Sequence, residues 1–280
     1  MNQSLFFPLT LITYLIIITV NLTVIISIIK EKKLHKPMYI FLCNQCFNSL
    51  YGTLGFYPKF LSDLLSGVQV ISYGGCLTQL YVIYTSVLCE ITILTVMAFD
   101  RYVAICKPLQ YHSIVSSLTV TKLLIFSWFY PLSTSVIVLG LTIRLPLCGS
   151  DIQKLFCDNT SVLKHSCVPI TLNTIWSFCL IFGQILQVIF IACSYCQIIR
   201  ACLNSKEGRI KFTQTCVPHL LTMVIFIIVT LFDVGYGWFG SMNNALNLRN
   251  AMAIQFLVIP PVFNPIIYGL NLQQLRQSLS

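Results

Sequence analysis

The residues with the clearest chemistry are Asp100 and Arg101, an acid and a base that adjoin within "MAFDRYVAICKPLQYHSI", Met97–Ile114. They follow a long, mostly apolar run. An unpaired arginine deep in lipid costs roughly 2.5–3.5 kcal/mol, and a neighbouring carboxylate offsets that cost. The pair is therefore either a charge that fixes the orientation of the chain in a membrane or a latch whose arginine changes partners when helices move.

Glu90 is the second informative charge, because it lies in the same apolar run ten residues before Asp100. Ten residues correspond to about 15 Å along a helix. This spacing predicts that Glu90 lies near the middle of a bilayer, where a carboxylate is expensive and usually functional.

The chain that must position these residues has the composition of a membrane protein. Its 280 residues are 56% hydrophobic and only 9% charged, and its mean hydropathy is +0.83. About a quarter of a soluble domain is charged. The net charge of +9 does not indicate nucleic acid binding, because the basic residues lie in short loops between apolar runs, as membrane topology requires.

Seven apolar segments predict an all-α bundle of seven transmembrane helices in a single domain, residues 1–280. Most exceed the roughly 20 residues needed to cross a bilayer as a helix, and the alternation expected of a transmembrane barrel strand is absent. The segments are Leu5–Ile29, Pro37–Leu61, Leu77–Cys106, Thr119–Ile143, Thr171–Ile199, Val217–Phe239 and Ala251–Leu270.

The distribution of Lys and Arg predicts the orientation of the bundle. One set of alternate loops is richer in these residues and includes the cluster from Lys30 to Lys36. The richer side is cytoplasmic, so we expect the N-terminus outside and the C-terminus inside. The glycosylation sequons at Asn2 and Asn159 then lie on the outer side.

Four of the thirteen cysteines, Cys76, Cys148, Cys157 and Cys167, are predicted to lie outside. An even number of cysteines in an oxidising compartment indicates two disulfides, but spacing alone leaves all three pairings open. Three of the four lie in a long outer loop, Arg144–Pro169, and a loop of that length usually covers a site. From Cys76 to Arg101 a helix rises about 37 Å, which places Arg101 at the cytoplasmic end.

Several function classes are disfavoured by the sequence. A transporter would show internal repeats and broken helices near the midplane, and neither is evident. A retinal-binding protein needs a Schiff-base lysine in its last helix, and Ala251–Leu270 contains no lysine. The hypothesis that we set against these classes is a ligand-gated signalling receptor without enzymatic activity.

Five motifs resemble those of odorant receptors, a branch of the rhodopsin-like G-protein-coupled receptors, and they occur in family order. Besides "MAFDRYVAICKPLQYHSI", they are "LHKPMYIFL" (Leu34–Leu42), "SYCQIIRACL" (Ser194–Leu203), "KFTQTCVPHL" (Lys211–Leu220) and "PPVFNPIIYGL" (Pro260–Leu270). The stretches "CGSDIQKLFC" and "TCVPHL" are most similar to the receptors of fishes. A non-olfactory rhodopsin-like receptor is the alternative.

The resemblance implies a switch at the cytoplasmic end. Arg101, next to Tyr102, would contact the G protein, and Asp100 would hold it at rest. Tyr195 and Tyr268 would swing inward to support the active state, and His219 would lie on the moving sixth helix. Residues Asn264, Pro265 and Tyr268 match the Asn-Pro-x-x-Tyr motif, in which the proline bends the helix.

The resemblance also implies the pairing Cys76–Cys157 and Cys148–Cys167, and a polar core formed by Glu90, Ser49 and Asn264. Ser49 stands where the family has a second acid. Glu90 therefore either binds sodium, the only ligand ion implied, or is protonated and hydrogen-bonded.

An odorant pocket is implied in the outer half of the bundle. Its expected residues are Ile83, Tyr84, Val87 and Leu88 on the third helix, Cys179, Gly183 and Gln184 on the fifth, and Thr230, Val234 and Trp238 on the sixth. The implied partners are a small-molecule odorant, a stimulatory heterotrimeric G protein, arrestin, trafficking chaperones and the lipid bilayer. The expected location is the plasma membrane of olfactory sensory cilia.

Overall fold

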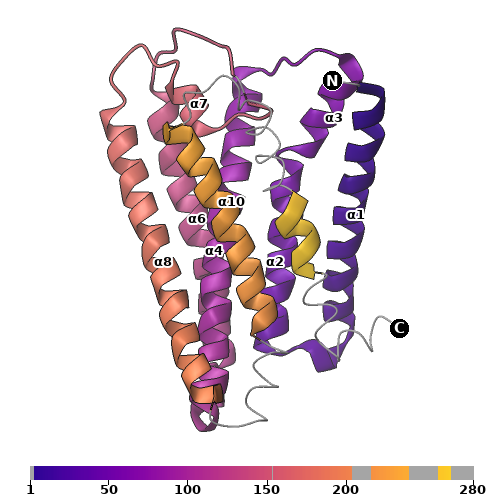
Figure 1. The fold of residues 1–280 in the computed structure, drawn as a ribbon, viewed down its shortest axis with the longest axis vertical. Coiled ribbons are helices and arrows are strands. Elements are labelled where there is room, and N and C mark those ends of the chain that lie inside the picture. Colours follow the sequence, from indigo (N-terminus) through magenta and orange to yellow (C-terminus); the bar gives the residue numbers. More distant parts are fainter. Residues whose placement is uncertain (1–2, 153, 204–215, 240–257, 266–280) are drawn as a thin grey trace.

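Long helices packed side by side dominate the structure (Figure 1), a computed structural model that describes residues 3–152, 154–203, 216–239 and 258–265. Side chains 3–5, 218 and 232–239 lie outside this description. The long helices are α1 Gln3–Lys30, α2 Pro37–Leu54, α3 Tyr57–Ser66, α4 Tyr73–Cys106, α6 Ser117–Ile143, α8 Thr171–Leu203 and α10 Val217–Phe239. Shorter elements are η1 Lys32–Leu34, η2 Pro108–Gln110, α5 Tyr111–Ile114 and α7 Asn159–Leu163.

The all-helical prediction is confirmed, because the described residues contain no β pairing beyond an isolated bridge between Leu147 and Ser166. Four described helices are long and apolar enough to cross a membrane, namely those within α1, α4, α6 and α8. Of the predicted seventh helix, only residues 258–265 are described, and they are helical.

The second predicted segment, Pro37–Leu61, is not one helix. It divides into α2 and α3 at Gly55 and Phe56. Pro58 lies in the first turn of α3, where its missing N–H costs nothing but where it cannot continue the ladder of α2. Gly55 also lies against α4, since a Cβ there would approach Val82 to 3.0 Å.

Helix α4 is the centre of the bundle and packs against α2, α6, α8 and α10. Gly52 permits the close approach of α2, because a Cβ at this position would lie 2.3 Å from Ser86 Oγ. Two apolar clusters surround α4 on its α8 side. The inner cluster contains Ile91, Leu94, Ala98, Ile191, Tyr195, Ile198, Cys202, Cys216, Met223 and Phe226. The outer cluster contains Cys76, Leu80, Val138, Cys157, Val162 and Leu180.

Asn21 ties α1 to the helical residues 258–265. Its Nδ2 donates to the carbonyl of Pro261 at 2.8 Å, and the side chain is fully buried. Pro265 stands four residues after Pro261 and has no N–H to donate to that carbonyl. Asn21 thus satisfies a backbone acceptor that the proline leaves without a helical partner.

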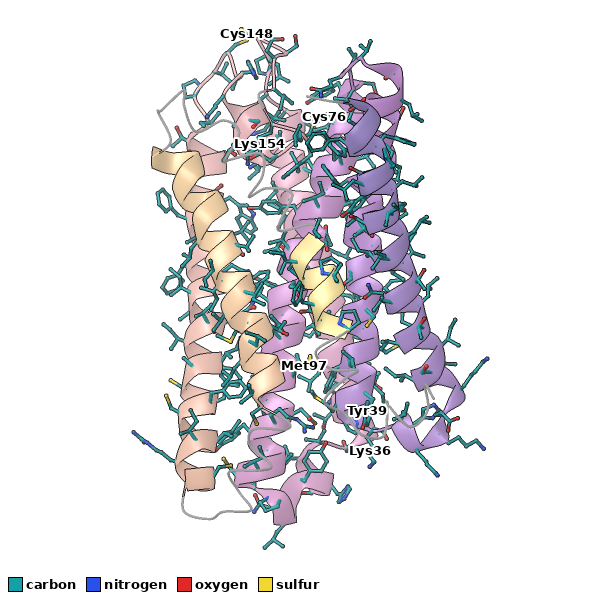
Figure 2. The ribbon with its side chains drawn as sticks, turned by 45° about the vertical axis from the view of Figure 1, so that its right-hand side comes forward. Lys36, Tyr39, Cys76, Met97, Cys148 and Lys154 are labelled. Carbon is teal, nitrogen blue, oxygen red and sulfur yellow. A yellow bond between two sulfur atoms is a disulfide. The ribbon has the colours of Figure 1, made fainter. Side chains whose placement is uncertain are left out.

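The outer loop is held by the disulfides Cys76–Cys157 and Cys148–Cys167, the pairing that the resemblance implied. Cys76 and Cys148 lie at one end of the bundle, and Lys36 and Tyr39 lie at the other (Figure 2). This arrangement agrees with the predicted orientation, in which the disulfides are outside and the lysine cluster is cytoplasmic.

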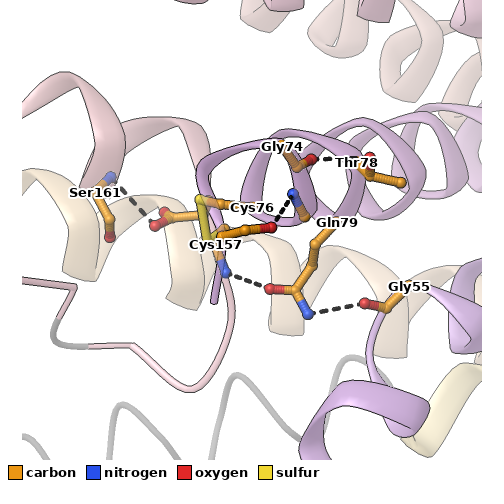
Figure 3. The surroundings of a disulfide bond; sticks show 10 residues. Gly55, Gly74, Cys76, Thr78, Gln79, Cys157 and Ser161 are labelled. Carbon is orange, nitrogen blue, oxygen red and sulfur yellow. Dashed lines mark hydrogen bonds between the residues drawn. A yellow bond between two sulfur atoms is a disulfide. The ribbon is translucent and has the colours of Figure 1, made fainter. Parts of the chain in front are cut away.

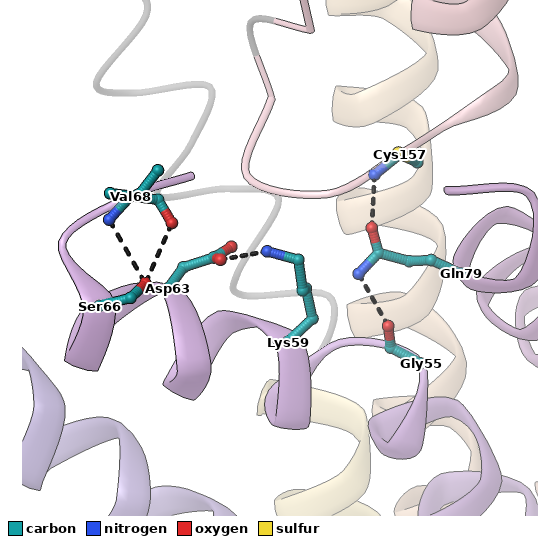
Figure 4. A network of polar contacts seen from close by, with 7 residues as sticks. All are labelled: Gly55, Lys59, Asp63, Ser66, Val68, Gln79 and Cys157. Carbon is teal, nitrogen blue, oxygen red and sulfur yellow. Dashed lines mark hydrogen bonds and ion pairs between the residues drawn. The ribbon is translucent and has the colours of Figure 1, made fainter. Parts of the chain in front are cut away.

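Gln79 reinforces the Cys76–Cys157 attachment (Figure 3). Its Oε1 accepts from the backbone N–H of Cys157 at 2.8 Å, and its Nε2 donates to the carbonyl of Gly55 at 2.9 Å. One buried amide therefore joins the outer loop, α4 and the break between α2 and α3. The nearby Lys59–Asp63 ion pair lies on α3, beyond this bridge (Figure 4).

We expect Cys76→Ser and Cys157→Ser to reduce the folded, surface-exposed receptor more than Cys148→Ser does. The two bridges span sequence separations of 81 and 19 residues. In the chain-entropy model, closing these loops stabilises the folded state by about 4.5 kcal/mol for Cys76–Cys157 and about 3 kcal/mol for Cys148–Cys167. Flow cytometry of an extracellular tag measures the difference, and a fully mature, active Cys76→Ser receptor would contradict it.

We expect Asn21→Val to destabilise the folded receptor by about 1–3 kcal/mol, because it leaves the buried Pro261 carbonyl without a donor. Thermal unfolding of the purified protein in detergent measures this loss. Thr19→Val is the matched control on the same helix, since the Thr19 hydroxyl bonds only to the Leu15 carbonyl of its own helix. Equal stability of the two variants would refute the tie.

Candidate functional site

The acid–base pair at the inner end of α4 is buried and has an additional partner. Arg101 Nη2 lies 2.5 Å from Asp100 Oδ2, and its Nε donates to the same oxygen at 3.1 Å. The Tyr111 hydroxyl, on α5, donates to Asp100 Oδ1 at 2.8 Å. The Asp100 side chain is fully buried, and that of Arg101 is 16% exposed.

Tyr111 was not identified from the sequence, although it lies inside the stretch Met97–Ile114. Eleven residues separate it from Asp100, and no helical or strand period connects the two. They meet because the chain leaves α4, forms η2 and turns back through α5. Tyr102, the third residue of the motif, instead packs against both sides of the inner half of the bundle.

Tyr195 and His219, predicted switch residues on α8 and α10, are in direct contact. The Tyr195 hydroxyl lies 2.6 Å from His219 Nδ1, and His219 Nε2 lies 3.1 Å from the carbonyl of Leu94 on α4. A carbonyl only accepts, so Nε2 donates to it and Nδ1 accepts from the tyrosine. This chain of bonds joins α8, α10 and α4 in the inner half of the bundle.

Glu90 lies in a buried polar group, as expected. Its Oε1 accepts from Asn264 Nδ2 at 2.9 Å, and its Oε2 accepts from Asn48 Nδ2 at 3.2 Å. The Oγ of Ser49 and the Oδ1 of Asn48 are buried and have no hydrogen-bond partner among the residues that the structure describes. A cavity of about 20 Å³ adjoins Ser49 and Glu90, which is enough space for one water or one small ion.

The predicted pocket residues of α4 face several neighbours. Ile83 is buried in a cluster with Phe56 and with the aromatic residues Tyr57 and Phe60 of α3. Tyr84 packs against the outer cluster. Val87 packs against the inner cluster. Leu88 is buried, with 4% of its surface exposed. These residues therefore form the inward side of α4 and do not converge on a single point.

Only one of the three predicted pocket residues on α8 lies on its inward stripe. That stripe contains Leu180, Gln184, Ile191 and Tyr195, which recur at helical spacing. Gly183 faces α6 instead, because a Cβ there would lie 3.2 Å from the Tyr130 hydroxyl. Cys179 is exposed on the surface of the helix. Of these three residues, Gln184 is therefore the one that faces inward, and the fifth-helix pocket residues stay a prediction.

On α10, Thr230 is partly buried and its hydroxyl is enclosed without a partner. The side chains of Val234 and Trp238 lie outside the described residues, as do Tyr268 and Asn2. Asn264 and Pro265 are buried. A separate groove of about 530 Å³ lies between α2 and α4 near the first outer loop, and none of the predicted pocket residues lines it.

The outer loop covers the bundle with an ordered polar group. Lys154 Nζ pairs with Asp158 Oδ2 at 2.8 Å, and Asp158 also caps α7 through the N–H of Ser161. Burial alone would raise the pKa of the Asp158 carboxyl, but Lys154 and the hydrogen bonds from Ser161 and Thr160 outweigh it and lower that pKa.

The predicted glycosylation site Asn159 is buried in this loop. Asn159 is 7% exposed, and its Oδ1 accepts from the Thr142 hydroxyl at 2.8 Å. A glycan on this amide would have to leave a buried position that holds α7 against α6. The sequence pattern reports only the acceptor tripeptide and not its burial, and glycosylation of Asn159 stays a prediction.

Comparison with known proteins agrees with this arrangement. The family model for olfactory receptors matches residues 10–280. Olfactory receptor 6Y1 of Homo sapiens is 36% identical over 281 residues, which cover 99% of this chain and 86% of that protein. Olfactory receptor 2C1 of Mus musculus is 34% identical over 281 residues, which cover 99% of this chain and 89% of that protein.

Olfactory receptor 226 of Rattus norvegicus is 34% identical over 285 residues, covering 99% of this chain and 86% of that protein. These similarities extend over nearly the full length of both chains and favour the olfactory class over other rhodopsin-like receptors. The narrower similarity to fish receptors stays a prediction. The chain belongs to the olfactory receptor family, the odorant-sensing G-protein-coupled receptors that cross the membrane seven times, and is not an enzyme.

Proposed function

We propose that this receptor binds a small odorant in the outer half of its bundle and activates a stimulatory G protein through Arg101, raising cAMP. The observation that carries the proposal is the inner end of α4, where Asp100 holds Arg101 and is itself held by Tyr111. In this state the guanidinium is committed to an intramolecular partner. This arrangement supports the proposal that Asp100 holds Arg101 in the resting receptor.

Activation requires the inner ends of the helices to separate. The bonds from Tyr195 to His219 and from His219 to the Leu94 carbonyl connect three helices at this level. Outward movement of α10 would break the bond to Leu94 and free the Tyr195 hydroxyl. Tyr195 could then stabilise Arg101 after it leaves Asp100, with Tyr268 in the same supporting role.

The outer half supplies the ligand site. Gln184 and Thr230 offer polar groups, while Tyr84, Val87 and Leu88 offer apolar surface, and the outer loop covers the helices above them. We also propose arrestin and trafficking chaperones as partners, and sensory cilia as the location, because these accompany receptors of this family.

Glu90 is proposed to be ionised and to bind one sodium ion. Both of its oxygens accept from amide N–H groups, which suits a carboxylate. Hard cations prefer oxygen ligands, and the unpartnered oxygens of Ser49 and Asn48 lie in this group. The ion would supply the positive charge that a buried carboxylate needs and would link α2 to α4.

We expect Arg101→Ala to abolish odorant-stimulated cAMP production while ligand binding and surface expression are retained, because the change removes the contact to the G protein. A cAMP reporter assay with parallel surface staining measures both. Arg144→Ala, at the exposed outer end of α6, is the control and should signal normally. Full signalling by Arg101→Ala would rule out the assigned role.

We expect sodium chloride to raise the melting temperature of the purified receptor relative to N-methylglucamine chloride at equal ionic strength, because a bound ion stabilises the folded state. Glu90→Gln should abolish the difference. Asp151→Asn, which changes an exposed acid in the outer loop, should retain it. An equal sodium effect in wild type and Glu90→Gln would exclude the site.

A further inference from the structure

Gln184 and Thr230 carry buried polar atoms that no other part of the described structure satisfies. Gln184 Nε2 and Thr230 Oγ1 are both enclosed and have no hydrogen-bond partner. Several helical threonines of this chain donate to the carbonyl four residues earlier, as Thr92 does to Leu88 and Thr95 to Ile91. Thr230 does not, so its hydroxyl hydrogen is available to another acceptor.

Helical register places these two side chains toward each other. Tyr195 on α8 contacts His219 on α10. Gln184 lies eleven residues before Tyr195, and Thr230 lies eleven residues after His219. Eleven residues are about three turns, so each side chain returns to the face that makes the inner contact.

The two helices run in opposite directions (Figure 1), so both steps lead toward the outer side. The rise is about 16 Å on each helix, and neither interval contains a proline. Gln184 and Thr230 therefore lie at a similar depth and face the same space between α8 and α10.

That space lies between two apolar layers. The layer on its cytoplasmic side belongs to the inner cluster. It contains Phe226 of α10, with Val87 of α4 and Val188 of α8 packed against the cluster. Above it are Leu80 and Leu180 of the outer cluster, with Trp176 packed against them. Gln184 is one turn above Val188 and one turn below Leu180, so the polar pair interrupts an otherwise apolar stack.

We propose that the odorant of this receptor is a neutral, carbonyl-bearing compound whose oxygen accepts hydrogen bonds from Gln184 and Thr230 and whose hydrocarbon part packs between the two apolar layers. The proposal rests on the proposed odorant-binding function and specifies its ligand class. Two donors aimed at one position fit an acceptor-only oxygen. Both side chains are uncharged, so a carboxylate or ammonium group would lose its hydration without a counter-charge from these two residues.

The test measures binding separately from signalling. Purified wild-type receptor in lipid nanodiscs is heated with an alkane, a ketone, an aldehyde, a carboxylic acid and an amine of matched chain length. Ligands that bind raise the melting temperature. We expect the ketone or aldehyde to stabilise the receptor and the alkane, acid and amine to have little effect.

Gln184→Leu and Thr230→Val should each lower the affinity for the carbonyl compound by roughly three- to tenfold, because each removes one hydrogen bond. Gln187→Leu and Thr95→Val are matched controls, because these residues pair with each other in the inner half of the bundle and should not alter the preference. A water molecule that merely bridges Gln184 and Thr230 would leave the preference for carbonyl compounds unchanged in the two test variants.

Several outcomes would overturn the proposal: equal stabilisation by the alkane or amine, no stabilisation by any carbonyl compound, or an unaltered carbonyl preference in both variants. The same compounds are then applied to cells with a cAMP reporter. Stabilisation without cAMP would count against the proposed signalling function and leave the ligand class intact, so the two failures are distinguishable.

Discussion

The constraint on which this structure depends is that polar groups on the central helix must find partners inside the bundle, because lipid supplies none. Helix α4 is buried along most of its length and carries Glu90 and Asp100. Asn48 and Asn264 bond to the first, and Arg101 and Tyr111 bond to the second. Helices α2, α5 and the residues 258–265 are thereby positioned around α4 by hydrogen bonds as well as by packing.

The breaks in helical structure follow the same constraint. Pro265 removes a backbone donor, and the carbonyl that it leaves free is bonded elsewhere. Asn21 bonds to the Pro261 carbonyl, and Gln79 bonds to the Gly55 carbonyl at the break between α2 and α3. A proline that would weaken an isolated helix thus becomes a point of attachment between α1 and the residues 258–265.

The inner and outer halves of the bundle are connected through α8 and α10. At the inner level the facing side chains, Tyr195 and His219, satisfy each other and the backbone of α4. Three helical turns closer to the outer side of the membrane, the facing side chains are Gln184 and Thr230. Their Nε2 and Oγ1 atoms have no hydrogen-bond partner within the described residues. A ligand that bonds to both would change the spacing of these helices at the outer level, and rigid helices would transmit that change to the inner contact.

The sequence by itself determined the all-helical class, the orientation and the position of Asp100, Arg101 and Tyr102 at the cytoplasmic end. These features depend on the length of apolar runs, on the loops that carry lysine, and on the rise of a helix, all of which are local. The resemblance to odorant receptors added the disulfide pairing, which spacing among four cysteines could not decide.

Only the tertiary structure decided which side chains meet. Tyr111 bonds to Asp100 because the chain turns back after α4, and Asn159 is buried because α7 folds onto Thr142. Gly183 faces α6, while Gln184, the next residue, faces inward. A step of one residue rotates a helical side chain by about 100°, so membership of a helix is readable from the sequence, whereas the neighbour that each face contacts depends on how the helices pack.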